Sequence, residues 1–224
     1  SLGQYVYSAV PEKKELYVNL FVSNETVLDW TESGIHVKLE TRFPWKNAYT
    51  LEVKDVPEGG IDILLRVPDY AQDYQTEING TIVSASDTEN GYQRIHLETD
   101  AEIKVSFRAP AKFVYANPQV RSDSGKVAIT RGPLVYCLEE IDNAQNLPAI
   151  FVNTEVSLEE EQSDLFGGIV AIKAKGKKII ENSVSAELYS TQKPELEDIE
   201  IKAVPYPYWN NRGEGEMLVW IKEL

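Results

Sequence analysis

The histidines and the cysteine are the side chains of this sequence best suited to nucleophilic or metal chemistry. The 224 residues contain two histidines, His36 and His96, and one cysteine, Cys137. A Ser-His-Asp triad or a histidine-based metal site needs a histidine in a cleft. Each histidine instead takes the outward position of an alternating strand pattern, which predicts exposed strand residues. A two-histidine zinc site is the alternative, but no further ligand pattern accompanies it.

Cys137 could act as a nucleophile if a base lay beside it. It falls within an apolar run at residues 134–138. A free cysteine in such a run usually behaves as a small buried hydrophobe. We therefore predict an inert side chain.

Carboxylates gather in three runs, at residues 158–164, 195–198 and 214–216. A glycosidase needs two carboxyl groups flanking one bond, roughly 5 to 9.5 Å apart, and sequence alone cannot pair them. Runs of like charge are usually solvated loops, and this is the interpretation we favour. A structural calcium site is the alternative, because hard cations prefer oxygen ligands.

Residues 206–213 form the most unusual stretch of the chain. Rings presented beside amides and an arginine could stack on sugar rings, or they could pack against another domain, because each aromatic side chain buries a large area. We favour packing over sugar binding. The residues expected to make either contact are Tyr206, Tyr208, Trp209, Asn210 and Arg212.

Composition narrows the classes of partner. The net charge of −14 and the pI near 4.6 oppose binding to phosphate backbones and to anionic membranes, whereas a neutral sugar is compatible with them. One cysteine cannot form an intramolecular disulfide or a cysteine-rich metal site. No apolar run reaches the roughly 18 residues of a spanning helix. We therefore expect no nucleic-acid partner, no membrane span and no cofactor held by this chain.

The elements that position these residues follow a period of two. Apolar side chains alternate with polar ones at residues 35–40, 49–54 and 103–108, as in antiparallel strands with one buried face. Asn79 and Gly80 separate two short strand patterns and predict a type I′ hairpin turn. We predict further turns at 58–60, 131–133 and 175–177, a central strand at 16–22, and at most one helical turn near 158–161.

A domain boundary is predicted at residues 109–111, where Pro110 stops one strand series and a second begins. We expect an all-β fold of two antiparallel β-sandwiches, jelly-roll or immunoglobulin-like, with little helix. Residues 1–110 form the first and residues 111–213 the second. A strand is also predicted at residues 217–221.

Several stretches, in order and over nearly the whole chain, resemble the C-terminal region of glycoside hydrolase family 127, the β-L-arabinofuranosidase family. The most specific covers residues 127–139. The set is 17–21 (YVNLF), 41–45 (TRFPW), 65–71 (LRVPDYA), 78–80 (ING), 127–139 (VAITRGPLVYCLE) and 204–221 (VPYPYWNNRGEGEMLVWI).

The resemblance implies a larger parent enzyme with an N-terminal (α/α)6 barrel followed by two β-sandwiches. In such enzymes the barrel holds a zinc site of cysteines and a glutamate, with one cysteine as nucleophile. None of that motif is present here, so no catalytic residue is carried over. The resemblance also implies that the last strand, residues 214–224, returns to complete the first sandwich. The first residues lack an initiator Met and a signal pattern, so we expect the chain to begin within a longer protein.

The leading functional hypothesis is therefore a non-catalytic accessory region that braces its own catalytic barrel and contributes to a homodimer. A carbohydrate-binding module that uses the aromatics at 206–209 is the second hypothesis, and an adhesion or scaffolding sandwich is the third. An independent hydrolase is a fourth. A periplasmic or extracellular home is favoured over a cytoplasmic one, because it fits polysaccharide degradation.

Overall fold

The computed structural model describes residues 2–83, 88–183 and 187–224. The chain divides into two compact units, Ser1–Ala109 and Pro110–Leu224. Within the described ranges, no helix is long and apolar enough to cross a membrane.

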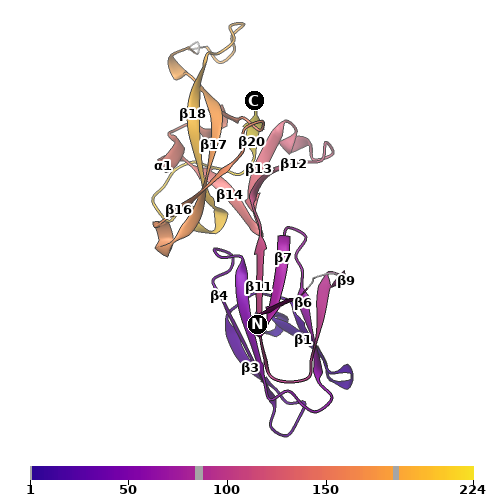
Figure 1. The fold of residues 1–224 in the computed structure, drawn as a ribbon. Coiled ribbons are helices and arrows are strands. Elements are labelled where there is room, and N and C mark those ends of the chain that lie inside the picture. Colours follow the sequence, from indigo (N-terminus) through magenta and orange to yellow (C-terminus); the bar gives the residue numbers. More distant parts are fainter. Residues whose placement is uncertain (1, 84–87, 184–186) are drawn as a thin grey trace. The chain divides into compact units, whose positions relative to one another are not determined.

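The described residues of the first unit, 2–83 and 88–109, form two sheets (Figure 1). Among the described strands of this unit, every pair is antiparallel except β2 with β6. The first sheet has the order β1 (Tyr7–Val10), β2 (Glu15–Val18), β6 (Ile61–Arg66), β10 (Tyr92–Leu97) and β9 (Thr88–Glu89). The second has the order β3 (Asn24–Leu28), β4 (Ile35–Thr41), β5 (Ala48–Lys54), β11 (Ala101–Arg108), β7 (Gln72–Ile78) and β8 (Thr81–Val83).

Alternation builds the core of this first unit. Inward residues of β4, β5 and β11, such as Val37, Leu51 and Ile103, have no exposed surface, while their neighbours face solvent. Apolar side chains that leave water supply most of the stability of such a sandwich. The predicted hairpin is confirmed: Asn79 and Gly80 both have positive φ, 48° and 83°, between β7 and β8.

In the second unit, the described strands form one continuous sheet. β13 pairs with β12, with β20 and, through Thr130 and Arg131, with β14, so the path of pairings returns to its start and encloses a core. Within residues 110–183 and 187–224, the one parallel pair is β15 with β20. The strands are β12 (Ala111–Tyr115), β13 (Lys126–Arg131), β14 (Leu134–Glu139), β15 (Ile150–Val152), β16 (Glu159–Ser163), β17 (Ile169–Ile179), β18 (Leu196–Pro205), β19 (Met217–Leu218) and β20 (Ile221–Glu223).

Helical segments are short, and the prediction of an all-β fold with little helix is confirmed. The one described α-helix is α1, a single turn after β14. The helical segments are α1 (Glu140–Asn143) and the 3₁₀ turns η1 (Leu2–Tyr5), η2 (Pro11–Lys13), η3 (Arg121–Asp123), η4 (Leu147–Ala149), η5 (Leu165–Gly167), η6 (Glu181–Ser183) and η7 (Tyr206–Tyr208).

The expectation that residues 214–224 complete the first sandwich is wrong. β20 lies between β13 and β15, with Ile221 opposite Val127, and β19 pairs with β14. Ile221 is 1% exposed and belongs to the core of the second unit. The predicted strand at 217–221 is also two short strands. An apolar pattern predicts that a segment is extended, but it does not say which strand will be its neighbour.

Four local predictions also need correction. Residues 175–177 form no turn, because they lie inside the long strand β17. Residues 158–161 form no helical turn, and the acidic run is no loop, because Glu159–Ser163 is strand β16. The predicted central strand at 16–22 ends as β2 at Val18. The turns at 58–60 and 131–133 are present.

Candidate functional site

The two histidines lie on different sheets of the first unit, His36 on β4 and His96 on β10. Their side chains are 46% and 53% exposed, so the prediction of exposed strand residues is confirmed. Nδ1 of His96 lies 2.7 Å from a carboxylate oxygen of Asp62. Arg94 joins that carboxylate to Glu15, with N–O distances of 2.6 and 2.9 Å. His96 and Arg94, whose side chains are 53% and 41% exposed, leave this ion-pair network open to solvent, whereas the side chain of Glu15 is only 10% exposed.

Cys137 is buried, as predicted, with 1% of its surface exposed on β14. Burial raises the pKa of its thiol to about 12. The thiolate is the nucleophilic form of cysteine, so the side chain is inert near neutral pH.

Metal ligands do not converge in the described part of the chain: no three His, Cys, Asp or Glu side chains there could hold an ion. The carboxylates of β16 face cations instead, with Glu161 3.1 Å from Lys173 and Glu160 2.7 Å from Arg131. The described residues therefore provide no suitable set of ligands for the structural calcium ion considered above. They also provide none for the zinc ion of the enzymes that the sequence resembles.

The aromatic loop, residues 206–213, begins as η7 directly after β18. The ring of Tyr208 stacks on Phe166, with centroids 4.6 Å apart and planes 8° from parallel. The rings of Tyr206 and Trp209 lie 6.3 Å apart at 19°, and these residues are 44% and 41% exposed. One side of the loop is therefore packed within the unit, and the other presents two rings to solvent.

Arg212 fixes this loop to the end of β14. Its guanidinium donates to the carboxylates of Glu139 and Asp142, all three side chains being at most 15% exposed. Glu139 also accepts a bond of 3.0 Å from the backbone N–H of Asn210. Lys202 lies 3.3 Å from Asp142. The sequence reasoning missed both acids, whose only signal was their place at the end of a strongly apolar strand.

The pKa of Asp142 reflects two opposing effects. Burial of this carboxyl acts to raise its pKa, but the hydrogen bond and charge of Arg212, with the charge of Lys202, outweigh burial and hold the pKa below its usual value. The carboxylate is thus the form that the folded protein favours.

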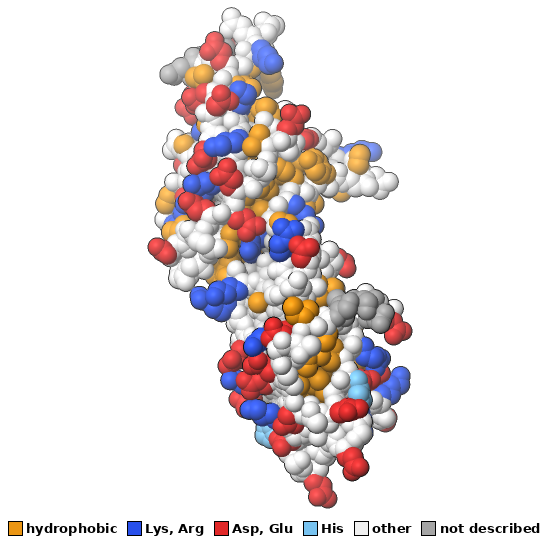
Figure 2. Space-filling view, in the orientation of Figure 1, with side chains coloured by type: hydrophobic (Ala, Val, Ile, Leu, Met, Phe, Trp, Pro, Cys, Tyr) orange, Lys and Arg blue, Asp and Glu red, His pale blue; other side chains and the backbone are white. Residues whose placement is uncertain are grey.

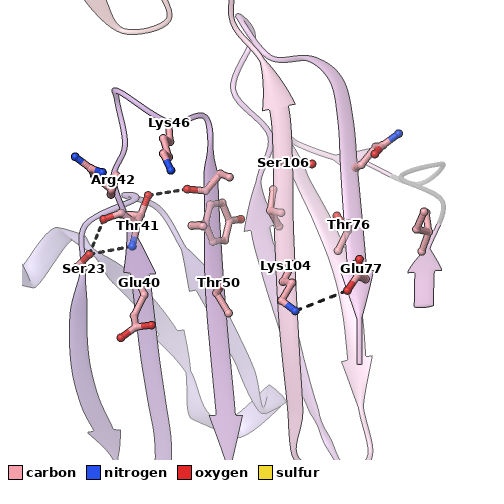
Figure 3. Close-up of a pocket in the computed structure, with 15 residues that line it drawn as sticks. Ser23, Glu40, Thr41, Arg42, Lys46, Thr50, Thr76, Glu77, Lys104 and Ser106 are labelled. Atoms are coloured by element: carbon pink, nitrogen blue, oxygen red, sulfur yellow. Dashed lines mark hydrogen bonds and ion pairs between the residues drawn. The ribbon is translucent and has the colours of Figure 1, made fainter. Parts of the chain in front are cut away.

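A second candidate site, also missed from sequence, is a groove on the outer face of the six-stranded sheet of the first unit (Figure 3). Its volume is about 700 Å³. Most of the residues that line it have polar side chains, and they come from every strand of the sheet or its loops.

On the face drawn in Figure 2, acidic and basic side chains are interspersed over both units rather than gathered by sign.

Comparison with known families explains the two-unit organisation. The model described as "Beta-L-arabinofuranosidase, GH127 middle domain" matches residues 15–111, and "Glycoside hydrolase family 127 C-terminal domain" matches residues 111–222. The chain belongs to glycoside hydrolase family 127. The two family-127 matches meet at residue 111, next to the division between the two units.

Individual members of family 127 agree with this assignment. The non-reducing end beta-L-arabinofuranosidase of Bifidobacterium longum subsp. longum is 30% identical over 234 aligned residues, covering 98% of this chain and 35% of that protein. A GH127 beta-L-arabinofuranosidase from Geobacillus stearothermophilus T6 has a similar structure, with a TM-score of 0.88 at 35% identity, over 100% of this chain and 36% of that one. A further GH127 beta-arabinofuranosidase gives 0.84 at 30% identity, over 100% and 37%. The chain thus spans little more than a third of each relative.

Proposed function

We propose that this chain is the non-catalytic C-terminal region of a β-L-arabinofuranosidase-like glycoside hydrolase, and that it braces the catalytic barrel of its parent. The observation that carries the proposal is the alignment of the whole chain with the middle and C-terminal domains of the family, over only 35% of a curated relative. The reaction, the zinc and its cysteine ligands are then assigned to the remaining part of the parent.

The chemistry of the described side chains supports this assignment. Hydrolysis needs a nucleophile or an activated water beside a general acid. The thiol of Cys137 is buried with a raised pKa, and the histidines occupy exposed positions on separate sheets. The carboxylates of Glu139 and Asp142, whose side chains are 6% and 10% exposed, are both bound to one arginine. These groups are placed to stabilise the fold.

The aromatic loop is the surface that we assign to contact with the rest of the parent. Aromatic side chains contribute strongly to interfaces because they bury large areas with few rotatable bonds. Tyr206 and Trp209 are held on a loop that Arg212 and Tyr208 anchor, so little order would be lost when another domain covers them. Exposed rings on an anchored loop favour packing.

An activity assay tests the catalytic part of the proposal. The full-length parent and the 224-residue chain would be incubated with an aryl β-L-arabinofuranoside, with and without added Zn²⁺. We expect turnover only from the parent. Metal-dependent turnover by the purified chain would contradict the proposal.

A second experiment tests the bracing surface. In the full-length parent, Trp209→Ala should lower the melting temperature of the catalytic part, while Tyr189→Ala, which removes an 89% exposed ring of the same unit, should not. Calorimetry of the chain with arabinan addresses the sugar-binding alternative. Heats that Trp209→Ala abolishes, together with an unchanged melting temperature of the parent, would replace bracing with sugar binding.

A further inference from the structure

The groove in the first unit arises from the sizes of side chains along two central strands. Three outward residues of β5 and β11 at this point are small: Ala48 lies opposite Ser106, and Thr50 lies next to them on β5, opposite the longer Lys104. The flanking strands carry longer side chains, including Glu40 opposite Thr50. Small side chains between longer ones leave a hollow whose floor is Ala48, Thr50 and Ser106.

The two ends of the groove differ in electrostatics. Lys104 is paired with Glu102 at 2.7 Å and lies 3.9 Å from Glu77, so this end is neutralised internally. At the other end, Arg42 and Lys46 extend from the loop that joins β4 to β5 (Figure 3). Neither side chain has a hydrogen-bond or ion-pair partner among the described residues.

The floor and one wall also keep unused hydrogen-bonding capacity. The hydroxyls of Thr50 and Ser106 and the amide of Gln75 line the groove and make no side-chain hydrogen bond to any other described residue. Together these groups can both donate and accept. They suit a ligand whose own groups do both at close spacing, as the hydroxyls of a sugar do.

The lining disfavours other classes of ligand. Most lining residues have polar side chains, whereas apolar atoms contribute the larger share of the exposed lining surface, so the groove suits a ligand that has both hydroxyls and C–H faces; Tyr49, the one aromatic among the lining residues, is turned into the core. A polyphosphate concentrates more negative charge at one point than Arg42 and Lys46 can balance, whereas a single carboxylate does not. The volume of about 700 Å³ is within the usual range of small-ligand sites.

We propose that this groove binds an oligosaccharide that carries a carboxylate, with its hydroxyls on Thr50, Gln75 and Ser106 and its carboxylate between Arg42 and Lys46. The binding is non-catalytic and independent of the bracing role, because the groove lies within the first unit and the aromatic loop within the second. It would hold an acidic glycan against the accessory region.

Calorimetry of the 224-residue chain with trigalacturonate and galactotriose tests the ligand class, because these probes differ in their carboxylates. We expect trigalacturonate to bind at least about tenfold more tightly, and its affinity to fall with added salt. Equal affinities, or no heat for either probe, would overturn the proposal.

A matched pair of variants tests the place. Ala48→Trp fills the floor, whereas Ala9→Trp adds the same ring to an exposed strand residue of the other sheet. Only Ala48→Trp should abolish binding of trigalacturonate. Both variants should keep the melting temperature of the unsubstituted 224-residue chain. Binding that survives in Ala48→Trp would overturn the assignment to this groove.

A second pair tests the charged end. Lys46 and Lys54 are exposed lysines near opposite ends of β5, and Lys54 lies outside the groove. Lys46→Gln should weaken trigalacturonate binding about tenfold, since it removes a charged hydrogen bond, and Lys54→Gln should not. Equal effects would overturn the carboxylate position. If Ala48→Trp instead loosens the catalytic part of the full-length parent and the chain binds neither sugar, the groove is an interdomain surface and the proposal fails.

Discussion

Arg212 holds two carboxylates, and their burial makes it a structural residue. Burying a charged group costs free energy unless the group has a partner of opposite charge. Loss of one member of such a set therefore leaves the others buried and unpaired, which destabilises the fold. Glu139 and Asp142 are both nearly enclosed, and both depend on Arg212. The arginine that looked suited to a ligand is therefore committed to the fold, and the two exposed rings remain as the contact groups of the loop.

Asp142 gives this network a pH dependence. Its pKa is lowered in the folded state, whereas an unfolded Asp titrates near 3.9. A lowered pKa contributes stability that is fully present above the unfolded value and is lost as the pH falls through the folded value. Unfolding by urea should therefore become easier below about pH 4 in the wild type.

The variant Asp142→Asn removes this contribution. It should be less stable than the wild type at pH 7, and the difference between the two should shrink between about pH 4 and pH 2. Intrinsic fluorescence in urea series at these pH values would measure it. A difference that stays constant over this range would show that titration of Asp142 does not contribute.

At the scale of elements, alternation predicted most strands because each sheet of the first unit has one dry face. This pattern did not predict a strand whose outward side chains form ion pairs with a neighbouring strand. The carboxylates of β16 look like a solvated loop in the sequence, but Glu159 and Glu161 lie on a strand that pairs with the lysine-bearing β17. Cross-strand charge pairing depends on a neighbour that a local pattern does not contain.

Gly176 shows the same limit for turns. Between two lysines it resembles a turn residue, yet it sits inside β17, where another backbone comes close. A Cβ at this position would lie 2.3 Å from the carbonyl oxygen of Phe151 and 2.6 Å from Ile201. Glycine is required here because of this approach.

Gly176→Ala should consequently destabilise the second unit by about 1–3 kcal/mol, because the strands must separate to admit a methyl group. Lys177→Ala, next along the strand, removes only a surface pair with Asp198 and should cost less than about 1 kcal/mol. Chemical denaturation would measure both. Equal costs would contradict the close approach as the reason for the glycine.

At the scale of the whole molecule, the fold class followed from the sequence, but the partner of the last strand and the groove did not. Ala48, Thr50 and Ser106 are ordinary exposed strand residues until the register of β5 and β11 brings them together. Register and strand neighbours are long-range properties, fixed by which side chains share a core.

Deleting residues 217–224 tests the strand neighbours directly. The deletion removes β19 and β20 and the buried Ile221, so β13 and β15 lose a shared partner. Hydrogen exchange should show lost amide protection in β13 and β15, with protection retained in β4 and β5. Protection lost in β4 and β5 but retained in β13 and β15 would instead show that the last strand belongs to the first unit.

The position of β20 also sets an order for synthesis in the cell. Residues up to Ala109 contain every described strand of the first unit, so that unit can fold while the ribosome is still translating the rest. The second unit lacks the strand between β13 and β15 until residues 221–223 have left the exit tunnel. Until then its nascent sheet keeps two unpaired edges, and this is the interval in which chaperones or neighbouring polysomal chains would meet it.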